Sequence, residues 1–202
     1  MNVPNTITLL RMILAIATIA MLFVPWQKEM QDKMYYTETV LSALVIWGDG
    51  LDGFFARKLN QCTKLGAVLD IASDRVVEMM YWIAFAILHW IPIWVPFLFL
   101  LRGTFVDAIR AQASEHGFTA FGEKTMMQSA LGKFLVSSNF SRFTYAVCKA
   151  LAFCLIILAQ ASSMSTTQLP FVALVLVYVS AGFCVVRGLP VLVEGKYLLS
   201  LK

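Results

Sequence analysis

Charged side chains are scarce in this sequence. Only 14% of its 202 residues are Asp, Glu, Lys or Arg, whereas soluble domains carry about a quarter. Hydrophobic residues make up 59% of the chain. This composition excludes a protein whose main solvent is water and predicts one that lies in a membrane.

Cysteine and histidine are also few, with four and two residues. No two cysteines have the C-x-x-C spacing, and three of the four lie in apolar segments, so neither a zinc site nor a disulfide framework is predicted. The net charge is +4, but the basic residues are scattered at the ends of apolar runs. We therefore expect them to meet a membrane surface and expect no nucleic-acid partner.

Long apolar runs dominate what remains. A helix needs about 20 apolar residues to cross the hydrocarbon layer, and the sequence has no internal repeat, low-complexity tract or domain linker. We predict an all-α integral membrane fold, with residues 1–202 forming one domain. Six spans are expected, near residues 6–26, 38–59, 65–90, 92–113, 140–161 and 168–189.

Lys and Arg give the expected orientation. They occupy the loops near 59–65 and 113–140 and the tail after 187, whereas the loops after Trp90 and Gln160 hold none. Both termini should therefore face the cytoplasm, although Lys28 and Lys33 in the first external loop weaken the bias.

In this arrangement the charges inside the apolar segments fall in cytoplasmic halves, and we expect them to converge on one polar cavity. They are Arg11, Asp49, Asp52, Asp70, Asp74, Arg75, Arg102, Asp107, Arg110 and Arg142. Snorkelling at helix ends is an alternative for Arg11, Lys149 and Arg187 taken singly. It does not account for four aspartates.

The aspartates form two pairs. Asp49 and Asp52 are three residues apart near the end of the second span, and Asp70 and Asp74 are four apart at the start of the third, so each pair shares a helix face. The polar turn around Asn60 makes the two helices antiparallel, which brings both faces together. Four carboxylates this close require a positive charge between them. All-oxygen ligation points to magnesium, manganese or calcium, and two ions are the arrangement used in displacement at phosphorus.

Small and polar residues accompany the aspartates. Gly53 and Gly66 leave room for a ligand, Arg57 suits a phosphate or shields a carboxylate, and Thr63 offers a hydroxyl to a nucleotide. Each glycine taken alone more often indicates helix packing in a membrane, where small residues are common between helices.

These residues together resemble the signature of the CDP-alcohol phosphotransferase family. The matching pattern is Asp49-x-x-Asp52-Gly53-x-x-Ala56-Arg57, eight residues, Gly66, three residues, Asp70, three residues and Asp74. The resemblance implies a six-helix, usually homodimeric membrane enzyme whose cavity faces the cytoplasm, here at the inner (plasma) membrane. It implies that Asp49, Asp52 and Asp70 bind two Mg²⁺ or Mn²⁺ ions, that Asp74 binds metal and acts as general base, and that Gly53, Ala56, Arg57, Thr63 and Gly66 form the CDP site.

The implied reaction moves a phosphatidyl group from CDP-diacylglycerol to a small polar alcohol and releases CMP. The stretch from Asn2 to Ala15 is similar to the start of phosphatidylglycerophosphate synthases, which use glycerol 3-phosphate. Four basic residues in or near the fourth and fifth spans suit a phosphorylated acceptor: Arg102, Arg110, Lys133 and Arg142. Structural ion pairs are the alternative for the arginines. Alternative acceptors are serine, inositol phosphate or another alcohol. Alternative functions are a cation transporter and an inactive scaffold.

Overall fold

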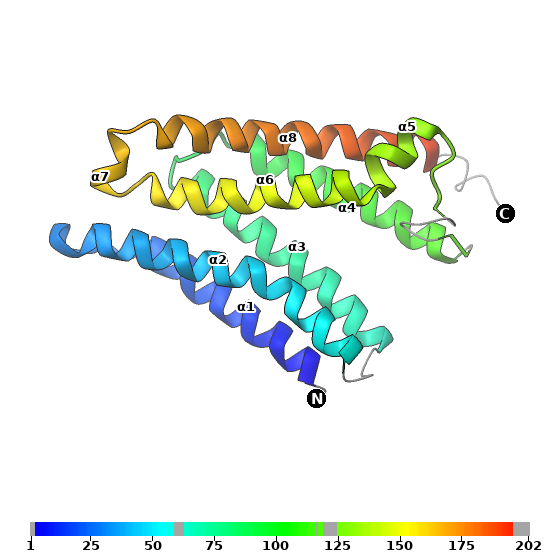
Figure 1. Ribbon diagram of the computed structural model, residues 1–202, viewed down its shortest axis with the longest axis horizontal. Helices are drawn as coiled ribbons and strands as arrows, with labels where there is room; N and C mark the ends of the chain where they lie inside the picture. Colours follow the sequence, from blue (N-terminus) through cyan, green and yellow to red (C-terminus); the bar gives the residue numbers. More distant parts are fainter. Residues whose placement is uncertain (1–2, 59–62, 116, 119–124, 196–202) are drawn as a thin grey trace. The chain divides into compact units, whose positions relative to one another are not determined.

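The computed structural model describes residues 3–58, 63–115, 117–118 and 125–195, apart from the side chains of residues 3, 4, 49–57, 64, 65 and 67. This part of the chain is helical and contains no strand (Figure 1). Its long helices are α1 (Val3–Leu22), α2 (Lys28–Lys58), α3 (Lys64–Ile87), α4 (Trp94–Glu115), α6 (Asn139–Leu158) and α8 (Leu169–Glu194). Each corresponds to one of the predicted apolar segments, so the all-α prediction is confirmed.

Three shorter elements connect the long helices. They are α5 (Ala130–Gly132), the π-helix η1 (Lys133–Ser137) that follows it directly, and α7 (Ser162–Ser165) between α6 and α8. The main departure from the prediction is α2, which begins at Lys28 rather than at residue 38. Its first turns are polar, so a search for apolar runs does not find them.

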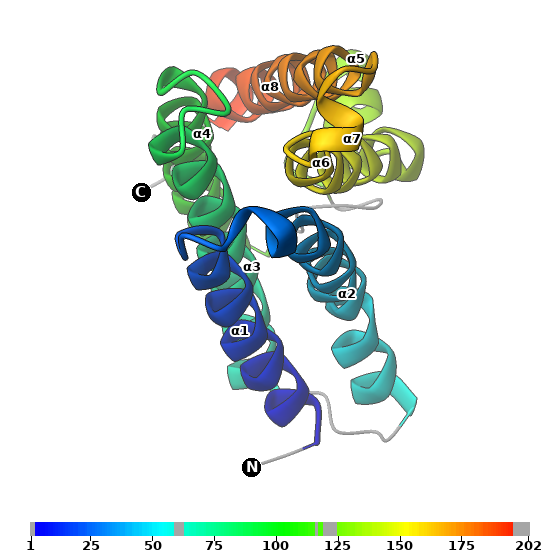
Figure 2. The same cartoon turned by 90° about the vertical axis from the view of Figure 1, so that its left-hand side faces the viewer.

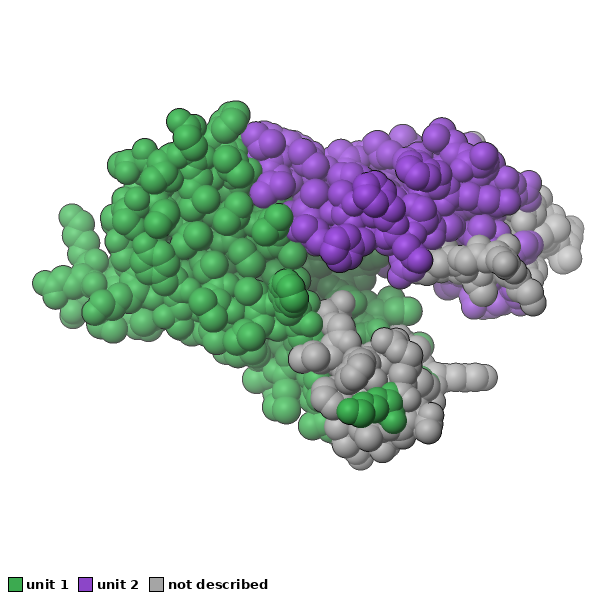
Figure 3. Space-filling view, in the orientation of Figure 1, with its two compact units in different colours: residues 1–91, 150–174 green, residues 92–149, 175–202 purple. Residues whose placement is uncertain are grey.

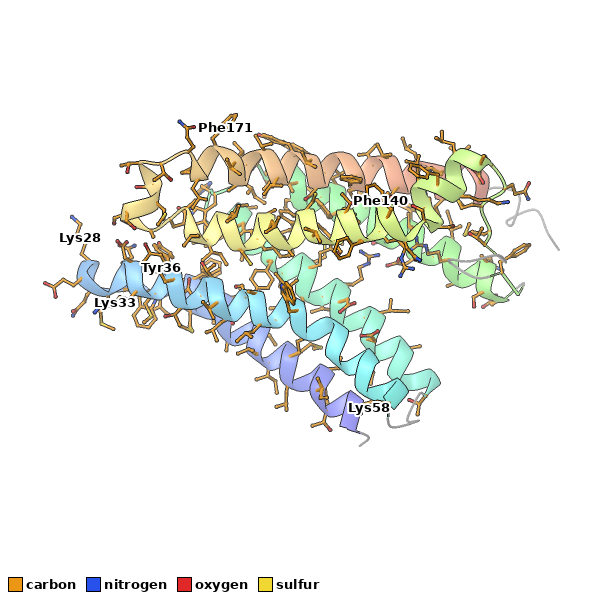
Figure 4. The ribbon with its side chains drawn as sticks, viewed as in Figure 1. Lys28, Lys33, Tyr36, Lys58, Phe140 and Phe171 are labelled. Carbon is orange, nitrogen blue, oxygen red and sulfur yellow. The ribbon has the colours of Figure 1, made fainter. Side chains whose placement is uncertain are left out.

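Three helices are long and apolar enough to cross a membrane, over Asn5–Leu22, Asn139–Leu158 and Leu169–Glu194. Six such spans were expected. The other long helices, α2, α3 and α4, contain the charged residues predicted to form the site, and these interrupt their apolar character. Many large apolar side chains are exposed, among them Phe140 and Phe171, as contact with lipid would require (Figure 4).

The chain divides into two compact units (Figure 3). Unit 1 comprises residues 1–91 and 150–174, and unit 2 comprises residues 92–149 and 175–202. In unit 1, α1 packs against both α2 and α3 (Figure 2). Since α2 and α3 carry the two pairs of aspartates, this packing makes α1 a neighbour of both acidic helices.

The core of unit 1 is aromatic. Phe153 of α6 lies between Tyr81 and Trp82 of α3, with ring centroids 5.2 and 4.6 Å away. The Tyr81 hydroxyl donates a hydrogen bond of 3.0 Å to Ser42 Oγ on α2. This core therefore fixes α2, α3 and the second half of α6 to one another, at a distance along α3 from its aspartates.

Hydrogen bonds fasten the amino-terminal end of α2. Asp32 accepts from the backbone N–H and the hydroxyl of Ser162, at 2.8 and 3.0 Å, and the hydroxyls of Tyr36 and Ser163 are 2.6 Å apart. Lys28, Lys33 and Tyr36 lie at this end of α2, and Lys58 lies at the other (Figure 4). The contacts with α7 explain why the helix extends beyond its apolar run.

Unit 2 is held together around α8. Val191 of α8 packs with Val106 and Ala113 of α4 and with Met126 and Met127. Beyond them, the Glu194 carboxylate accepts from Gln128 N–H at 2.6 Å and from the N–H and hydroxyl of Ser129. The end of α8 thus fixes the segment that leads into α5 and the π-helix.

Candidate active site

Two of the predicted carboxylates lie on α3, where Asp70 and Asp74 are one helical turn apart. The helix begins at a well-defined cap, because Thr63 has an extended backbone and its side-chain oxygen accepts from Gly66 N–H at 2.9 Å. That hydroxyl is exposed and retains its own proton for donation. The cap sets where the first turn begins and hence which way the aspartates point.

Gly66 also sets the distance between α3 and α1. A methyl group at this position would lie 2.9 Å from Asn5 Oδ1 of α1 and 2.9 Å from Thr63 Oγ1. Real Cβ atoms do not approach this closely, so any larger residue would displace either the cap or α1. This contact is the physical reason for a glycine here, and it brings Asn5 to the predicted CDP-binding turn.

Asp74 is paired with a buried arginine. Arg11 of α1 donates from Nη2 to Asp74 Oδ1 at 2.5 Å and to Ser73 Oγ at 3.2 Å. The Arg11 side chain is 6% exposed, whereas that of Asp74 is 42% exposed. The Ser73 hydroxyl in turn donates to the backbone carbonyl of Asp70 at 2.9 Å. Arg11 therefore supports the acidic face of α3 from its buried side.

The remaining members of the predicted metal and CDP sites belong to the last turns of α2. Asp49, Asp52, Gly53, Ala56 and Arg57 are helical in backbone, but their side chains lie outside the described part of the chain. Gly48, the residue before Asp49, faces Arg11, since a methyl group there would lie 3.5 Å from Arg11 Cδ. Arg11 thus touches both acid-bearing helices.

The donor set fits a hard divalent cation. The side chains are carboxylates, with oxygen as the only ligand atom, and a guanidinium already lies against one of them. In the described part of the chain no three His, Cys, Asp or Glu side chains gather closely enough to share an ion. Two of the four predicted ligands fall outside that part.

A second group of charges lies in unit 2. Arg187 of α8 is only 4% exposed. Its guanidinium donates to the carbonyls of Leu135 and Val136 at 2.8 and 3.2 Å and to Ser141 Oγ at 2.5 Å. Leu135 and Val136 belong to the π-helix, whose wider turns leave backbone carbonyls open to other donors.

Two of the four cations predicted to meet the acceptor lie near Arg187. Arg102 and Arg142 are both close enough to repel it electrostatically. The Arg102 side chain crosses α8 at Gly188, where a methyl group would lie 2.8 Å from its Cγ. Within the described residues, its buried Nε has no hydrogen-bond partner. Arg102, Arg142 and Arg187 are named the arginine cluster below.

The other two predicted cations are placed differently. Lys133 is exposed at the first residue of the π-helix and interacts electrostatically with Glu194. Arg110 lies two turns along α4 from Arg102 and is partly buried. Sequence reasoning placed Arg11 in the polar cavity without finding its pairing with Asp74, and it considered Arg187 only as a residue that could snorkel. Their depth was the available signal, because each lies at least two turns inside a helix that is otherwise apolar.

Comparison with known proteins points to one family. The family model described as CDP-alcohol phosphatidyltransferase matches residues 1–186. A protein named CDP-diacylglycerol–glycerol-3-phosphate 3-phosphatidyltransferase from Aquifex aeolicus is 42% identical over 76 residues, which cover 38% of each chain. Proteins of the same name from Wigglesworthia glossinidia brevipalpis and Pseudomonas fluorescens are each 30% identical, over 122 and 168 residues.

The extent of these matches differs. They cover 58% of this chain and 63% of the Wigglesworthia protein, and 77% of this chain and 82% of the Pseudomonas protein. The chain therefore spans less than two thirds of the first two relatives and most of the third. The family generally depends on divalent metal ions, in agreement with the all-oxygen donor set. The match along nearly the whole sequence, signature included, shows that this chain belongs to the CDP-alcohol phosphatidyltransferase family.

Proposed function

We propose that this protein transfers a phosphatidyl group from CDP-diacylglycerol to glycerol 3-phosphate and releases CMP. The proposal rests on the surroundings of Asp74. Its carboxylate is partly exposed and forms a salt bridge with the buried guanidinium of Arg11. A general base must be fixed in direction and still reach its substrate, and Asp74 meets both requirements. The names of the three relatives support glycerol 3-phosphate as the acceptor.

In this proposal Asp49, Asp52, Asp70 and Asp74 hold two Mg²⁺ or Mn²⁺ ions. When bound, the ions supply neutralisation of the charge that grows on the departing phosphate. Asp74 accepts the proton of the attacking hydroxyl at its carboxylate. Arg11 holds that carboxylate by a hydrogen bond of 2.5 Å from its buried guanidinium to Oδ1.

The nucleotide and the acceptor are assigned to separate groups of residues. Gly53, Ala56, Arg57, Thr63 and Gly66 bind the CDP moiety, with Gly66 and the Thr63 cap forming its described part. Arg102, Arg110, Lys133 and Arg142 bind the phosphate of the acceptor, and Arg187 joins them on the strength of its place in the arginine cluster. Guanidinium groups donate several hydrogen bonds in a planar geometry that matches a phosphate.

We also propose that α2, α3 and α4 cross the membrane with the three apolar helices, which places both termini and the active site at the cytoplasm. At about 1.5 Å per residue, the shortest of them is roughly 33 Å long, and the hydrocarbon layer is about 30 Å thick. Their charges are tolerated because they serve the site. From the family resemblance we expect one domain and a homodimer in the inner (plasma) membrane, which cross-linking in native membranes would test.

The deciding experiment is CMP release by purified protein in detergent, with CDP-diacylglycerol and Mg²⁺ or Mn²⁺. Glycerol 3-phosphate, serine, inositol phosphate and buffer alone are compared as acceptors. We expect release with glycerol 3-phosphate and at least 100-fold less with Asp74→Asn, in line with the usual contribution of a general base, roughly 10²–10⁴-fold.

Glu78→Gln is the matched control for Asp74→Asn. Glu78 lies one turn further along α3 and pairs with Arg75 at 3.1 Å. The amide oxygen of glutamine can still accept that hydrogen bond, so turnover should stay within about threefold of the parent. An Asp74→Asn variant as active as this control would remove Asp74 from the mechanism. Preference for serine or inositol phosphate would keep the metal-site chemistry and reject the acceptor, and absence of CMP with every acceptor would reject the proposed reaction.

A further inference from the structure

Arg11 lies where three helices of unit 1 meet. It belongs to α1, it hydrogen-bonds to Ser73 and Asp74 of α3, and its aliphatic stem lies against Gly48 of α2. Gly48 directly precedes the first aspartate of the signature. Arg11 is therefore a cation that contacts both acid-bearing helices.

The pair that Arg11 forms with Asp74 has two different sides. The guanidinium fills the buried side, and the carboxylate keeps a side chain that is nearly half exposed. Burial of an arginine is costly unless its charge is paired and its N–H groups are satisfied, and here one Nη2 serves both Asp74 and Ser73. Because Ser73 is bonded to the Asp70 carbonyl, the support extends along the turn that joins Asp70 to Asp74.

We propose that Arg11 is the positioning residue and built-in counter-ion of Asp74, an inference that rests on the proposed function. By holding Oδ1, it fixes the direction of the carboxylate toward the acceptor hydroxyl. By adding one positive charge to a group of four carboxylates, it also reduces the attraction of that group for divalent cations. Arg11 thus orients the Asp74 carboxylate and lowers the affinity of the site for divalent cations.

These two effects give Arg11→Met an unusual combination of properties. Loss of positioning should lower kcat about 100-fold, the typical effect of misplacing a reacting group by about 1 Å, while KM for CDP-diacylglycerol stays within about threefold. Loss of the charge should lower the half-saturating Mn²⁺ concentration about tenfold. The assays are CMP release and titration of protein with Mn²⁺, followed by the electron paramagnetic resonance signal of free Mn²⁺.

Two further substitutions separate charge from geometry. Arg11→Lys keeps the charge, so Mn²⁺ affinity should match the parent and kcat should recover to within about tenfold. Arg11→Gln removes the charge but keeps a donor of moderate length, so it should show the tighter Mn²⁺ binding even if Arg11→Met does not fold. Thr18→Val is the matched control: Thr18 is fully buried on the same helix, and its hydroxyl bonds to the Leu14 carbonyl and to Tyr81, away from the aspartates.

If Arg11 is merely structural, Arg11→Met will lower thermal stability, kcat and Mn²⁺ affinity together, and that result would overturn the proposal. The control Thr18→Val is expected to lower stability alone. Unchanged kcat and unchanged Mn²⁺ affinity in folded Arg11→Met would overturn it equally. If the parent protein releases no CMP with any acceptor, the proposed function fails separately. The Mn²⁺ titration then decides the counter-ion role, since tighter binding in Arg11→Met and Arg11→Gln supports it and unchanged or weaker binding rejects it.

Discussion

A single methyl group at Gly188 should weaken the binding of glycerol 3-phosphate without disturbing the chemistry at the aspartates. In Gly188→Ala the new Cβ would lie 2.8 Å from Arg102 Cγ, a separation that real Cβ atoms do not show. Cγ is near the start of the side chain, so Arg102 cannot avoid the contact by moving only its tip. It must adopt another rotamer, which carries its guanidinium away from Arg142 and Arg187.

The size of the effect follows from the interaction that is lost. A hydrogen bond to a charged group contributes about 1.5–3 kcal/mol, and about 1.4 kcal/mol corresponds to a factor of ten. We therefore expect KM for glycerol 3-phosphate to rise about 10- to 100-fold, with KM for CDP-diacylglycerol within about twofold of the parent. Stability should not fall, because alanine is favoured over glycine inside a helix by about 1 kcal/mol.

The same helix supplies the control. Gly182 also lies in α8, but a methyl group there would have nothing within 4 Å. Gly182→Ala should therefore leave both KM values unchanged. The assay is initial-rate CMP release with each substrate varied in turn, together with the melting temperature of each variant. Equal KM values for glycerol 3-phosphate in Gly188→Ala and Gly182→Ala would refute a role for Arg102 in acceptor binding.

Two further predictions concern stability in detergent. Trp82 is fully buried against Phe153, so Trp82→Ala should cost about 3–5 kcal/mol of unfolding free energy by thermal or denaturant melting; Ile83→Ala, at an exposed position of the same helix, should cost less than half as much. Glu38 is 1% exposed, and its Oε2 has no hydrogen-bond partner among the described residues. Glu38→Met should therefore raise the melting temperature, by an amount equivalent to about 1–3 kcal/mol, and a lower melting temperature would indicate a partner that Glu38 needs.

The helices could be predicted because a membrane helix is specified by one continuous stretch of the sequence, about 20 apolar residues long. The start of α2 could not. The segment from Lys28 to Thr37 is polar, and it is fastened by contacts with residues far along the chain, such as Asp32 with Ser162. Nor does an apolar helix reveal its core-facing side: Phe99 is buried and Phe97 is 58% exposed, although both lie in the same apolar run.

The same distinction applies to the candidate site. The spacing of Asp70 and Asp74 is a local property of one helix, and it predicted their common face correctly. The partner of Asp74 is 63 residues away in the chain. An arginine eight residues into an apolar helix is equally consistent with snorkelling, with an ion pair and with a substrate contact. Only the packing of α1 against α3 decides between these possibilities.

The two buried arginines, Arg11 and Arg187, have different hydrogen-bond partners, and this difference indicates different functions. Arg11 forms a salt bridge with Asp74, so the pair has no net charge, and its contribution is to orient the carboxylate. Arg187 donates instead to two π-helix carbonyls and one hydroxyl, and no acid pairs with it among the described residues. Neutral acceptors satisfy the N–H groups without cancelling the charge.

This difference makes Arg187 a source of positive potential that Arg102 and Arg142 reinforce. Three guanidinium ions lie in one unit, and both Arg102 and Arg142 repel Arg187 electrostatically. Binding of a phosphate dianion would relieve that repulsion, whereas serine, which has no net charge, would not. The acceptor preference should therefore depend on the arginine cluster rather than on the aspartates, which would explain how one metal site can serve a family with different acceptor alcohols.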